Sequence, residues 1–154
     1  MRFGLFIATC GYIGYVPVAP GTFGSAVGLA LFALIRWSGS TAIELGVIVL
    51  LLALGVWSGN VAERHFRQVD PGPVVLDEVA GMLITLALIP VTVSGAIVGF
   101  LIFRLFDVIK PWPANRLEAL PGGLGMMADD AMAAVYGNIA MRFLIAGLPA
   151  GWLS

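Results

Sequence analysis

Residues 102–113 read Ile-Phe-Arg-Leu-Phe-Asp-Val-Ile-Lys-Pro-Trp-Pro, an apolar run with a charge at every third position and a proline stop. In a helix, Arg104, Asp107 and Lys110 would share roughly a third of the circumference. Pro111 ends such a helix because proline has no N–H to donate. Two cations beside one carboxylate, at the mouth of a hydrophobic segment, indicate a site for phosphate and metal. The cations could also simply reach from a buried helix to the bilayer surface.

The composition of the chain indicates a membrane protein. Of its 154 residues, 60% are hydrophobic and only 11% are charged, and the mean hydropathy is +1.00. A soluble domain has about a quarter of its residues charged. We therefore expect a membrane to be the solvent, and the length predicts a single domain over residues 1–154. No basic tract points to a nucleic-acid partner.

Long apolar runs predict an all-α integral membrane bundle of five or six helices. After a short N-terminal segment, the runs cover residues 23–37, 41–57, 79–103 and 131–148. Thr22 is well placed to cap the first of these helices. The small residues Gly24, Ser25 and Gly28 would let that helix approach a neighbour closely.

The uncharged stretch 79–103 has two interpretations. It could be one transmembrane helix, since about 20 residues suffice to span. Alternatively, Pro-Val-Thr-Val-Ser-Gly at 90–95 is the turn of a hairpin of two short helices, because proline disfavours a continuous helix. A single helix would separate Asp77 from Asp107 by roughly 40 Å at 1.5 Å per residue. A hairpin places both at the same end, and we predict the hairpin.

With the hairpin, the polar ends of the helices lie on one side of the membrane. Charged residues are confined to 63–78 and 104–130, apart from Arg2, Arg36, Glu44 and Arg142. Basic residues are in excess on the side that holds these two segments. Since cytoplasmic loops carry such an excess, we place the charged side in the cytoplasm.

Five acids could meet at that side: Asp77, Glu78, Asp107, Asp129 and Asp130. Their mutual repulsion calls for a hard divalent cation, and Mg²⁺ prefers oxygen ligands together with a substrate phosphate. Arg104 and Lys110 would bind that phosphate. Simpler interpretations exist for each group alone. An acidic pair at a helix N-terminus commonly only stabilises the helix dipole, and Asn60 and Glu63 could form an ordinary solvated helix end.

The residue types and motifs that the sequence lacks exclude several reaction mechanisms. The chain has one cysteine, Cys10, and one histidine, His65. This excludes an internal disulfide, a thiolate-rich metal site and any mechanism needing two histidines from one chain. There is no phosphate-binding Walker loop and no Asp-x-Asp pair. Metal-activated water attacking a phosphomonoester is the simplest remaining reaction.

Four blocks of the sequence resemble one known family. They are Ala19-Pro-Gly-Thr-Phe-Gly-Ser25, Asp77-Glu-Val-Ala-Gly81, Phe103-Arg-Leu-Phe-Asp-Val-Ile-Lys-Pro-Trp-Pro113 and Gly122-Gly-Leu-Gly-Met-Met-Ala-Asp-Asp130. In order and spacing they are similar to the phosphatidylglycerophosphatase A family. The resemblance implies a helical, multi-pass enzyme of the bacterial inner membrane. It also implies hydrolysis of phosphatidylglycerophosphate to phosphatidylglycerol and phosphate in phospholipid biosynthesis, with Mg²⁺ as cofactor.

The resulting hypothesis is a Mg²⁺-dependent lipid phosphatase, a phosphoric monoester hydrolase whose active site faces the cytoplasm. The predicted metal ligands are Asp77, Asp107 and Asp130, with Glu78 and Asp129 as further ligands or bases. The predicted phosphate-binding residues are Arg104, Lys110 and Thr22, and Asn60 and Glu63 are secondary candidates. The membrane and the phospholipid substrate are the expected partners.

The alternative is a small membrane protein that transports cations or protons. It predicts acids spread through the depth of the bilayer, whereas Glu44 is predicted near the end of a helix. The number of metal ions, the identity of the base, the oligomeric state and the selectivity among lipid phosphomonoesters stay open.

Overall fold

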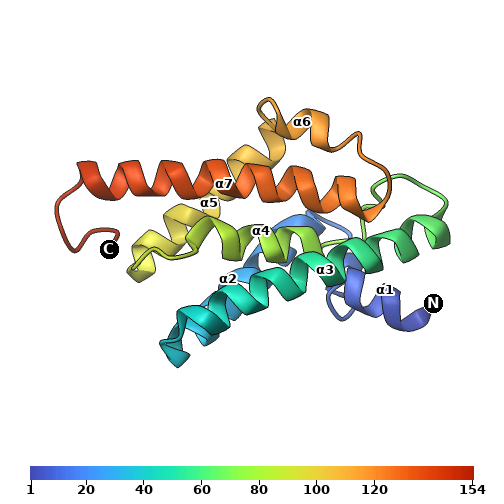
Figure 1. Ribbon diagram of the computed structural model, residues 1–154, viewed down its shortest axis with the longest axis horizontal. Helices are drawn as coiled ribbons and strands as arrows, with labels where there is room; N and C mark the ends of the chain where they lie inside the picture. Colours follow the sequence, from blue (N-terminus) through green and yellow to red (C-terminus); the bar gives the residue numbers. More distant parts are fainter.

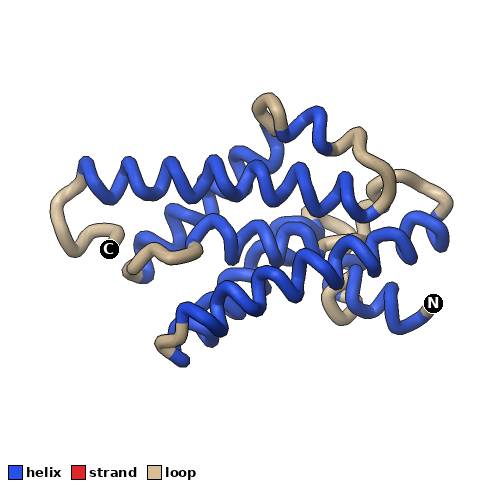
Figure 2. The backbone as a smooth tube through the Cα atoms, in the orientation of Figure 1, coloured by secondary structure: helices blue, strands red, loops and turns tan.

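The computed structural model describes residues 1–154 as a bundle of α-helices without strands (Figure 1, Figure 2). The helices are α1 (Arg2–Ala8), α2 (Pro20–Ser38), α3 (Thr41–Phe66), α4 (Leu76–Leu86), α5 (Val93–Ile109), α6 (Ala114–Leu117) and α7 (Gly123–Gly147), with one 3-10 turn, η1 (Ile13–Tyr15). The seven α-helices exceed the expected five or six because two short ones, α1 and α6, flank the long helices. The all-helical prediction is confirmed.

The stretch 79–103 is a hairpin, as predicted, and not one helix. α4 ends at Leu86 and α5 begins at Val93. Thr92 caps α5, since its Oγ1 accepts a hydrogen bond from the N–H of Gly95 at 3.1 Å. Leu88 has a φ of +59°, so the chain reverses through a left-handed residue just before Pro90. The turn therefore occupies residues 87–92, slightly earlier than the predicted 90–95.

Helix α4 is the centre of the bundle. It packs mainly against α2 and α7, and nine of its 11 residues are buried. The largest core cluster combines Met82 and Leu83 of α4 with Phe32, Phe103 and Met141 from three neighbouring helices. Eleven residues rise about 16 Å along a helix, roughly half the hydrocarbon thickness of a bilayer. Because α4 is covered by protein, this short helix is stable without spanning the membrane.

Small residues allow α2 to lie directly on α4; the sequence predicted such close packing but not the partner helix. A Cβ on Gly28 would lie 2.7 Å from Cβ of Met82 and 2.8 Å from the carbonyl oxygen of Val79. The glycine therefore sets the distance between the two helices. The predicted cap of this helix was wrong: α2 begins at Pro20 with Ala19 at the N-cap, and Thr22 is exposed within the first turn. Proline suits that first turn because its missing N–H would have no helical partner.

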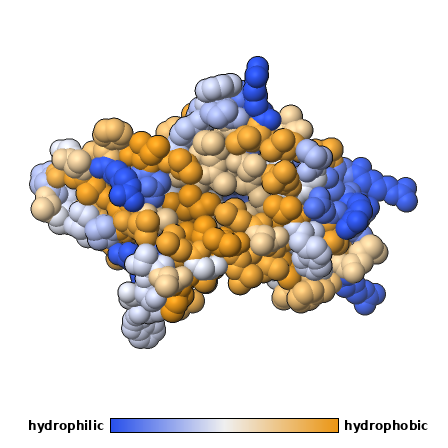
Figure 3. All heavy atoms as spheres, viewed as in Figure 1, coloured by the Kyte–Doolittle hydropathy of each residue, from blue (hydrophilic) through white to orange (hydrophobic).

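The surface is that of a membrane protein. Helices α2 and α3 are each long and apolar enough to cross a membrane. Large apolar side chains are exposed along the bundle, among them Leu34, Val49, Ile97 and Phe143. Figure 3 shows an apolar band over the middle of the molecule and hydrophilic atoms toward its ends. This distribution matches a bilayer around the middle of the bundle.

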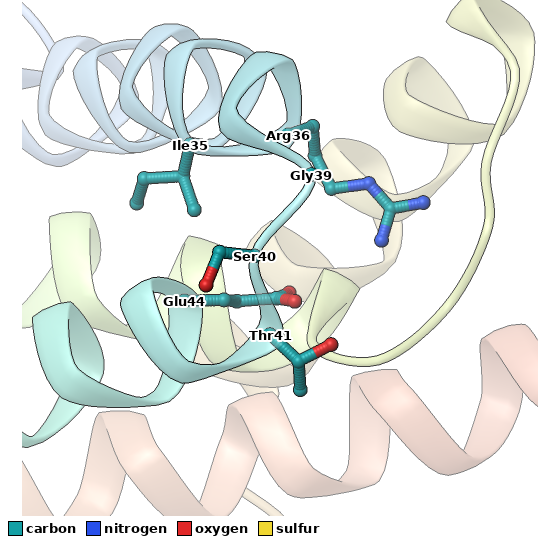
Figure 4. A pocket seen from close by; sticks show the side chains of 6 residues that line it. All are labelled: Ile35, Arg36, Gly39, Ser40, Thr41 and Glu44. Carbon is teal, nitrogen blue, oxygen red and sulfur yellow. The ribbon is translucent and has the colours of Figure 1, made fainter.

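At the end of the bundle that holds the hairpin turn, which we call the far end, polar side chains form hydrogen bonds with the turn. Glu44 is 3% exposed, and its Oε1 accepts a hydrogen bond from the N–H of Leu88 at 3.2 Å. Asn138 donates to three carbonyl oxygens near the end of α4, that of Ala87 at 2.9 Å. Glu44 lines a pocket of about 220 Å³ at the α2–α3 turn together with Arg36 and Ser40. Figure 4 shows these side chains. Glu44 thus lies at a helix end, as expected.

Replacing Gly28 by Ala is expected to destabilise the fold by about 1–3 kcal/mol, because the new methyl group overpacks the α2–α4 contact. The matched control is Gly46→Ala on α3, where a Cβ would have no neighbour within 4 Å. That control should be neutral, or stabilising by up to about 1 kcal/mol through helix propensity. Thermal unfolding of the purified proteins in detergent, followed by circular dichroism, measures both. Equal midpoints for the two variants would contradict the close packing.

Candidate active site

Three helix ends bring the buried acids together. α4 and α7 begin, and α5 ends, in the same half of the molecule (Figure 1). Asp77, Asp107, Asp129 and Asp130 are all buried there, with exposed fractions between 1% and 8%. Glu78 is partly buried beside them. The five acids expected to converge therefore do converge, and the remainder of the site is built around them.

Asp77, Glu78 and Asp130 form the tightest group. Each offers a carboxylate oxygen, and these oxygens all lie within 4.8 Å of one another. Oε2 of Glu78 and Oδ2 of Asp130 are buried and have no hydrogen-bond partner. Buried acceptors without a partner are costly. A hard divalent cation such as Mg²⁺ would fit these residues, since it binds carboxylate oxygens and would satisfy both.

The pKa values of Asp77, Glu78 and Asp130 also show that the negative charge of these buried carboxylates is not balanced by the protein. Burial, followed by the neighbouring carboxylates, raises the pKa of Asp77 and of Asp130 well above the usual value for Asp. Burial also raises the pKa of Glu78 to about 7. These residues lie outside the two candidate membrane spans, α2 and α3. Without a cation the charged forms are therefore disfavoured, and a bound cation would favour them.

The other two acids are paired with the two cations of α5. Nη1 of Arg104 lies 2.5 Å from Oδ2 of Asp107 and 3.8 Å from Oε1 of Glu78. Nζ of Lys110 lies 2.5 Å from Oδ2 of Asp129. One end of α5 is thereby tied to both α4 and α7. The predicted ligand Asp107 thus contacts Arg104, while Glu78 completes the group of three oxygens.

Lys110 follows α5 in a left-handed conformation with a φ of +45°. Its Nζ also lies 3.6 Å from Oε1 of Glu118, which is on the rim of the site. Burial lowers the pKa of Lys110, but the hydrogen bond and the charge of Asp129 outweigh this and raise it overall. Lys110 is therefore a permanent cation that the site holds close to its acids.

Gly21 is a site residue that the sequence analysis missed. A Cβ at this position would lie 2.2 Å from Oε1 of Glu78 and 3.0 Å from Nη1 of Arg104. The first turn of α2 therefore packs directly on the Arg104–Glu78 pair. The predicted phosphate ligand Thr22 is the next residue and is exposed. The sequence feature that could have identified Gly21 is its place in the Ala-Pro-Gly-Thr block, since its lack of a side chain lets α2 approach Glu78 and Arg104.

Asn60 and Glu63 contact none of the site acids, but each accepts a hydrogen bond from the backbone of a segment near a site helix. Oδ1 of Asn60 accepts a hydrogen bond from the N–H of Gly123 at 3.0 Å, so it satisfies the start of α7. Oε1 of Glu63 accepts one from the N–H of Asp70 at 3.5 Å in the loop before α4. Both contacts hold segments at or near the start of a helix that carries site acids.

Replacing Lys110 by Met leaves Asp129, which is 1% exposed, without its cation. Removing one partner of a buried pair costs about 3–5 kcal/mol, so the thermal midpoint in detergent should fall strongly. The control is Arg116→Met, since Arg116 is exposed and makes no ion pair. A midpoint for Lys110→Met equal to that of the control would show that Asp129 does not depend on this pair.

Comparison with known proteins agrees with the blocks seen in the sequence. The model of a family described as phosphatidylglycerophosphatase A matches residues 6–145. Proteins named phosphatidylglycerophosphatase A from Escherichia coli K12 and from Haemophilus influenzae are 33% and 34% identical to the chain. Those alignments cover 92% and 83% of the chain, and 83% and 80% of the relatives.

A third relative carries a different name. It is a Bacteroides thetaiotaomicron protein named "Putative phosphatidylinositol-3-phosphatase", 35% identical over 133 residues, which are 82% of the chain and 83% of the relative. No solved structure matches the chain. The family match covers most of the chain and all five converging acids. The chain therefore belongs to the phosphatidylglycerophosphatase A family.

Proposed function

We propose that this protein is a Mg²⁺-dependent lipid phosphatase that hydrolyses phosphatidylglycerophosphate to phosphatidylglycerol and phosphate in phospholipid biosynthesis. The observation that carries the proposal is the group of Asp77, Glu78 and Asp130, with two unpartnered buried oxygens at the polar end of an apolar bundle. The names of the Escherichia coli and Haemophilus influenzae relatives supply the substrate. A lipid phosphate is the ligand that suits such a boundary, since its tails need hydrocarbon and its phosphate needs charge.

Asp77, Glu78 and Asp130 would hold the metal ion, which supplies charge neutralisation and activates water when bound. This choice replaces the predicted ligand Asp107 by Glu78. The reason is the geometry: Asp107 already accepts a hydrogen bond from Arg104, whereas Glu78 has a free oxygen.

Arg104 and Lys110 bind the phosphate of the substrate. Each is held at 2.5 Å by a buried Asp, which fixes the direction of the cation before the substrate arrives. Preorganised cations stabilise the charge that develops on the phosphoryl oxygens. Thr22, exposed at the start of α2, would add a hydrogen bond to the headgroup.

The reaction breaks the bond between phosphorus and the ester oxygen. A water oxygen attacks phosphorus, and the proton of that water passes to a buried carboxylate outside the group of three, Asp107 or Asp129. The same carboxylic acid then gives this proton to the leaving glycerol oxygen, which becomes the hydroxyl of phosphatidylglycerol, and the carboxylate is regenerated. General acid–base help of this kind contributes about 10²–10⁴-fold to a rate.

We place the protein in the bacterial cytoplasmic membrane with the site facing the cytoplasm. Basic residues are concentrated at the site end: Arg64, Arg67, Arg104, Lys110 and Arg116. Arg2 joins them, since α1 packs on α3 where Gly4 faces Val61. Arg36 and Arg142 lie at the far end. This asymmetry supports the orientation because cytoplasmic segments carry the excess of Lys and Arg.

Replacing Asp77 by Asn should lower phosphate release from phosphatidylglycerophosphate by at least about 100-fold, because a ligand charge is lost at the reacting centre. The assay uses purified protein in mixed micelles with Mg²⁺. The matched control is Glu44→Gln, which removes a buried carboxylate at the far end and keeps an acceptor for Leu88. It should stay within twofold of the unmodified protein. Full activity of Asp77→Asn would refute the assigned site.

Removal of divalent cations tests the cofactor separately. Chelation by EDTA should abolish phosphate release, and added Mg²⁺ should restore it. Calorimetry of Mg²⁺ binding should show a site in the unmodified protein that Glu78→Gln weakens at least tenfold. Undiminished turnover in EDTA would rule out Mg²⁺ as the cofactor. It would not contradict the proposed substrate.

The headgroup needs its own test because the Bacteroides relative is named for another lipid. We expect kcat/KM for phosphatidylglycerophosphate to exceed that for phosphatidylinositol 3-phosphate at least tenfold, with both lipids carrying identical acyl chains. The reverse order would assign the inositol lipid as the substrate.

A further inference from the structure

An apolar groove runs between α5 and α7 and starts at the active site. Its volume is about 440 Å³, and its lining is Phe106, Pro111, Trp112, Tyr136, Ile139, Ala140 and Phe143. A second hollow of about 300 Å³ shares Ile139 and Phe143 and is completed by Arg142 and Ala146. The two hollows form one path along α7. We refer to it as the α5–α7 groove.

The groove and the phosphate-binding residues belong to the same segments. Phe106 directly precedes Asp107, and Pro111 directly follows Lys110. The Lys110–Asp129 pair joins α5 to α7, the two helices that form the groove walls. A molecule whose phosphate rests at Lys110 therefore has the groove beside it.

The wall of the groove formed by Phe106 and Trp112 is held in place by contacts with Tyr136. The hydroxyl of Tyr136 donates a hydrogen bond to the carbonyl oxygen of Trp112 at 2.8 Å. The rings of Tyr136 and Phe106 also pack, with centroids 5.9 Å apart. These contacts anchor the Lys-Pro-Trp-Pro segment against α7. They also use the only side-chain hydroxyl in the lining, so the hollow nearest Lys110 offers a hydrocarbon and aromatic surface. Arg142, in the second hollow, donates a hydrogen bond to Oδ1 of Asn138 at 2.8 Å.

The shape and the exposure of the groove fit a single extended chain of methylene groups. From Tyr136 to Ala146 the path is about 15 Å long at 1.5 Å per residue. Trp112 is 70% exposed and Phe143 is 75% exposed, so the groove opens sideways along the bundle. A lipid can enter such a groove from the bilayer without leaving it.

Another apolar hollow, lined by Leu29, Phe32, Val91, Ala96 and other residues, lacks this connection. It has a volume of about 390 Å³ and lies between α2 and the first turns of α5, next to Arg36. That is the far end of the bundle, so a lipid whose headgroup phosphate rests at Lys110 meets the α5–α7 groove first.

We propose that the α5–α7 groove binds one acyl chain of the lipid substrate and so selects long-chain lipids; this inference rests on the proposed function. The headgroup phosphate is held by Arg104 and Lys110, and the chain lies along α7 past Ala140. Binding energy from the tail then positions the phosphate at the site.

The test fills the groove with Ala140→Phe. The matched control is Ala53→Phe on α3, where Ala53 is exposed and lines no pocket. Two substrates are compared in the same detergent, dioleoyl phosphatidylglycerophosphate and its deacylated form, glycerophosphoglycerophosphate. The deacylated form keeps the headgroup phosphate but has no acyl chain to place in the groove.

For Ala140→Phe we expect kcat/KM to fall at least tenfold for the dioleoyl lipid and less than twofold for the deacylated substrate. Ala53→Phe should change neither by more than twofold. Equal effects of Ala140→Phe on both substrates, or none, would overturn the groove assignment. So would a change in the mass of the detergent-solubilised protein caused by Ala140→Phe, since that would make the groove a contact between two copies.

A second measurement does not depend on the folding of a variant. The unmodified protein is irradiated with a phosphonate analogue of the lipid carrying a diazirine in the middle of one acyl chain. Adducts on residues 136–146 support the proposal, and adducts confined to other helices overturn it. If the unmodified protein releases no phosphate from the dioleoyl lipid, the proposed function itself has failed, and this control is performed first.

Discussion

The structure depends on compensating buried negative charge at one end of an apolar bundle. Four Asp side chains are less than one-tenth exposed there, and charges in such surroundings are stable only with close partners. The cations of α5 supply part of the compensation through Arg104 to Asp107 and Lys110 to Asp129. The group of Asp77, Glu78 and Asp130 keeps two oxygens unpartnered. The uncompensated negative charge is thus concentrated at one point, where three helix ends meet, and this is the feature on which the proposed metal site rests.

Much of the fold could be predicted from the sequence because hydrocarbon surroundings allow few solutions. Long apolar runs must be helical, since every backbone group needs an internal partner. The hairpin also followed from the sequence, because Pro90 disfavours one long helix and because Asp77 and Asp107 had to meet. The convergence of the five acids was correctly predicted by the same reasoning. The start of α2 was not, since Thr22 is a common cap, whereas Pro20 begins the helix and Ala19 adopts a left-handed conformation.

Pairing within the site was beyond sequence analysis. Spacing along α5 places Arg104, Asp107 and Lys110 on one face, but it does not say which acid each cation meets. That choice depends on how close α4 and α7 come, which is set by contacts far apart in the chain. Gly21 and Asn60 show the same limit. Gly21 matters because its lack of a side chain leaves room for Glu78 and Arg104. Asn60 matters because its side-chain oxygen accepts a hydrogen bond from the first N–H of α7.

The hairpin turn also constrains how the protein is made. α4 is about 16 Å long, so the turn at residues 87–92 would lie within the hydrocarbon of a surrounding bilayer, where its backbone polar groups cannot rely on water. Its partners come from distant parts of the chain: Glu44 precedes it by more than 40 residues, and Asn138 and Arg142 follow it by about 50. α7 is synthesised after the hairpin. The carbonyl oxygen of Ala87 therefore gains its partners on α7 only after that helix has been made.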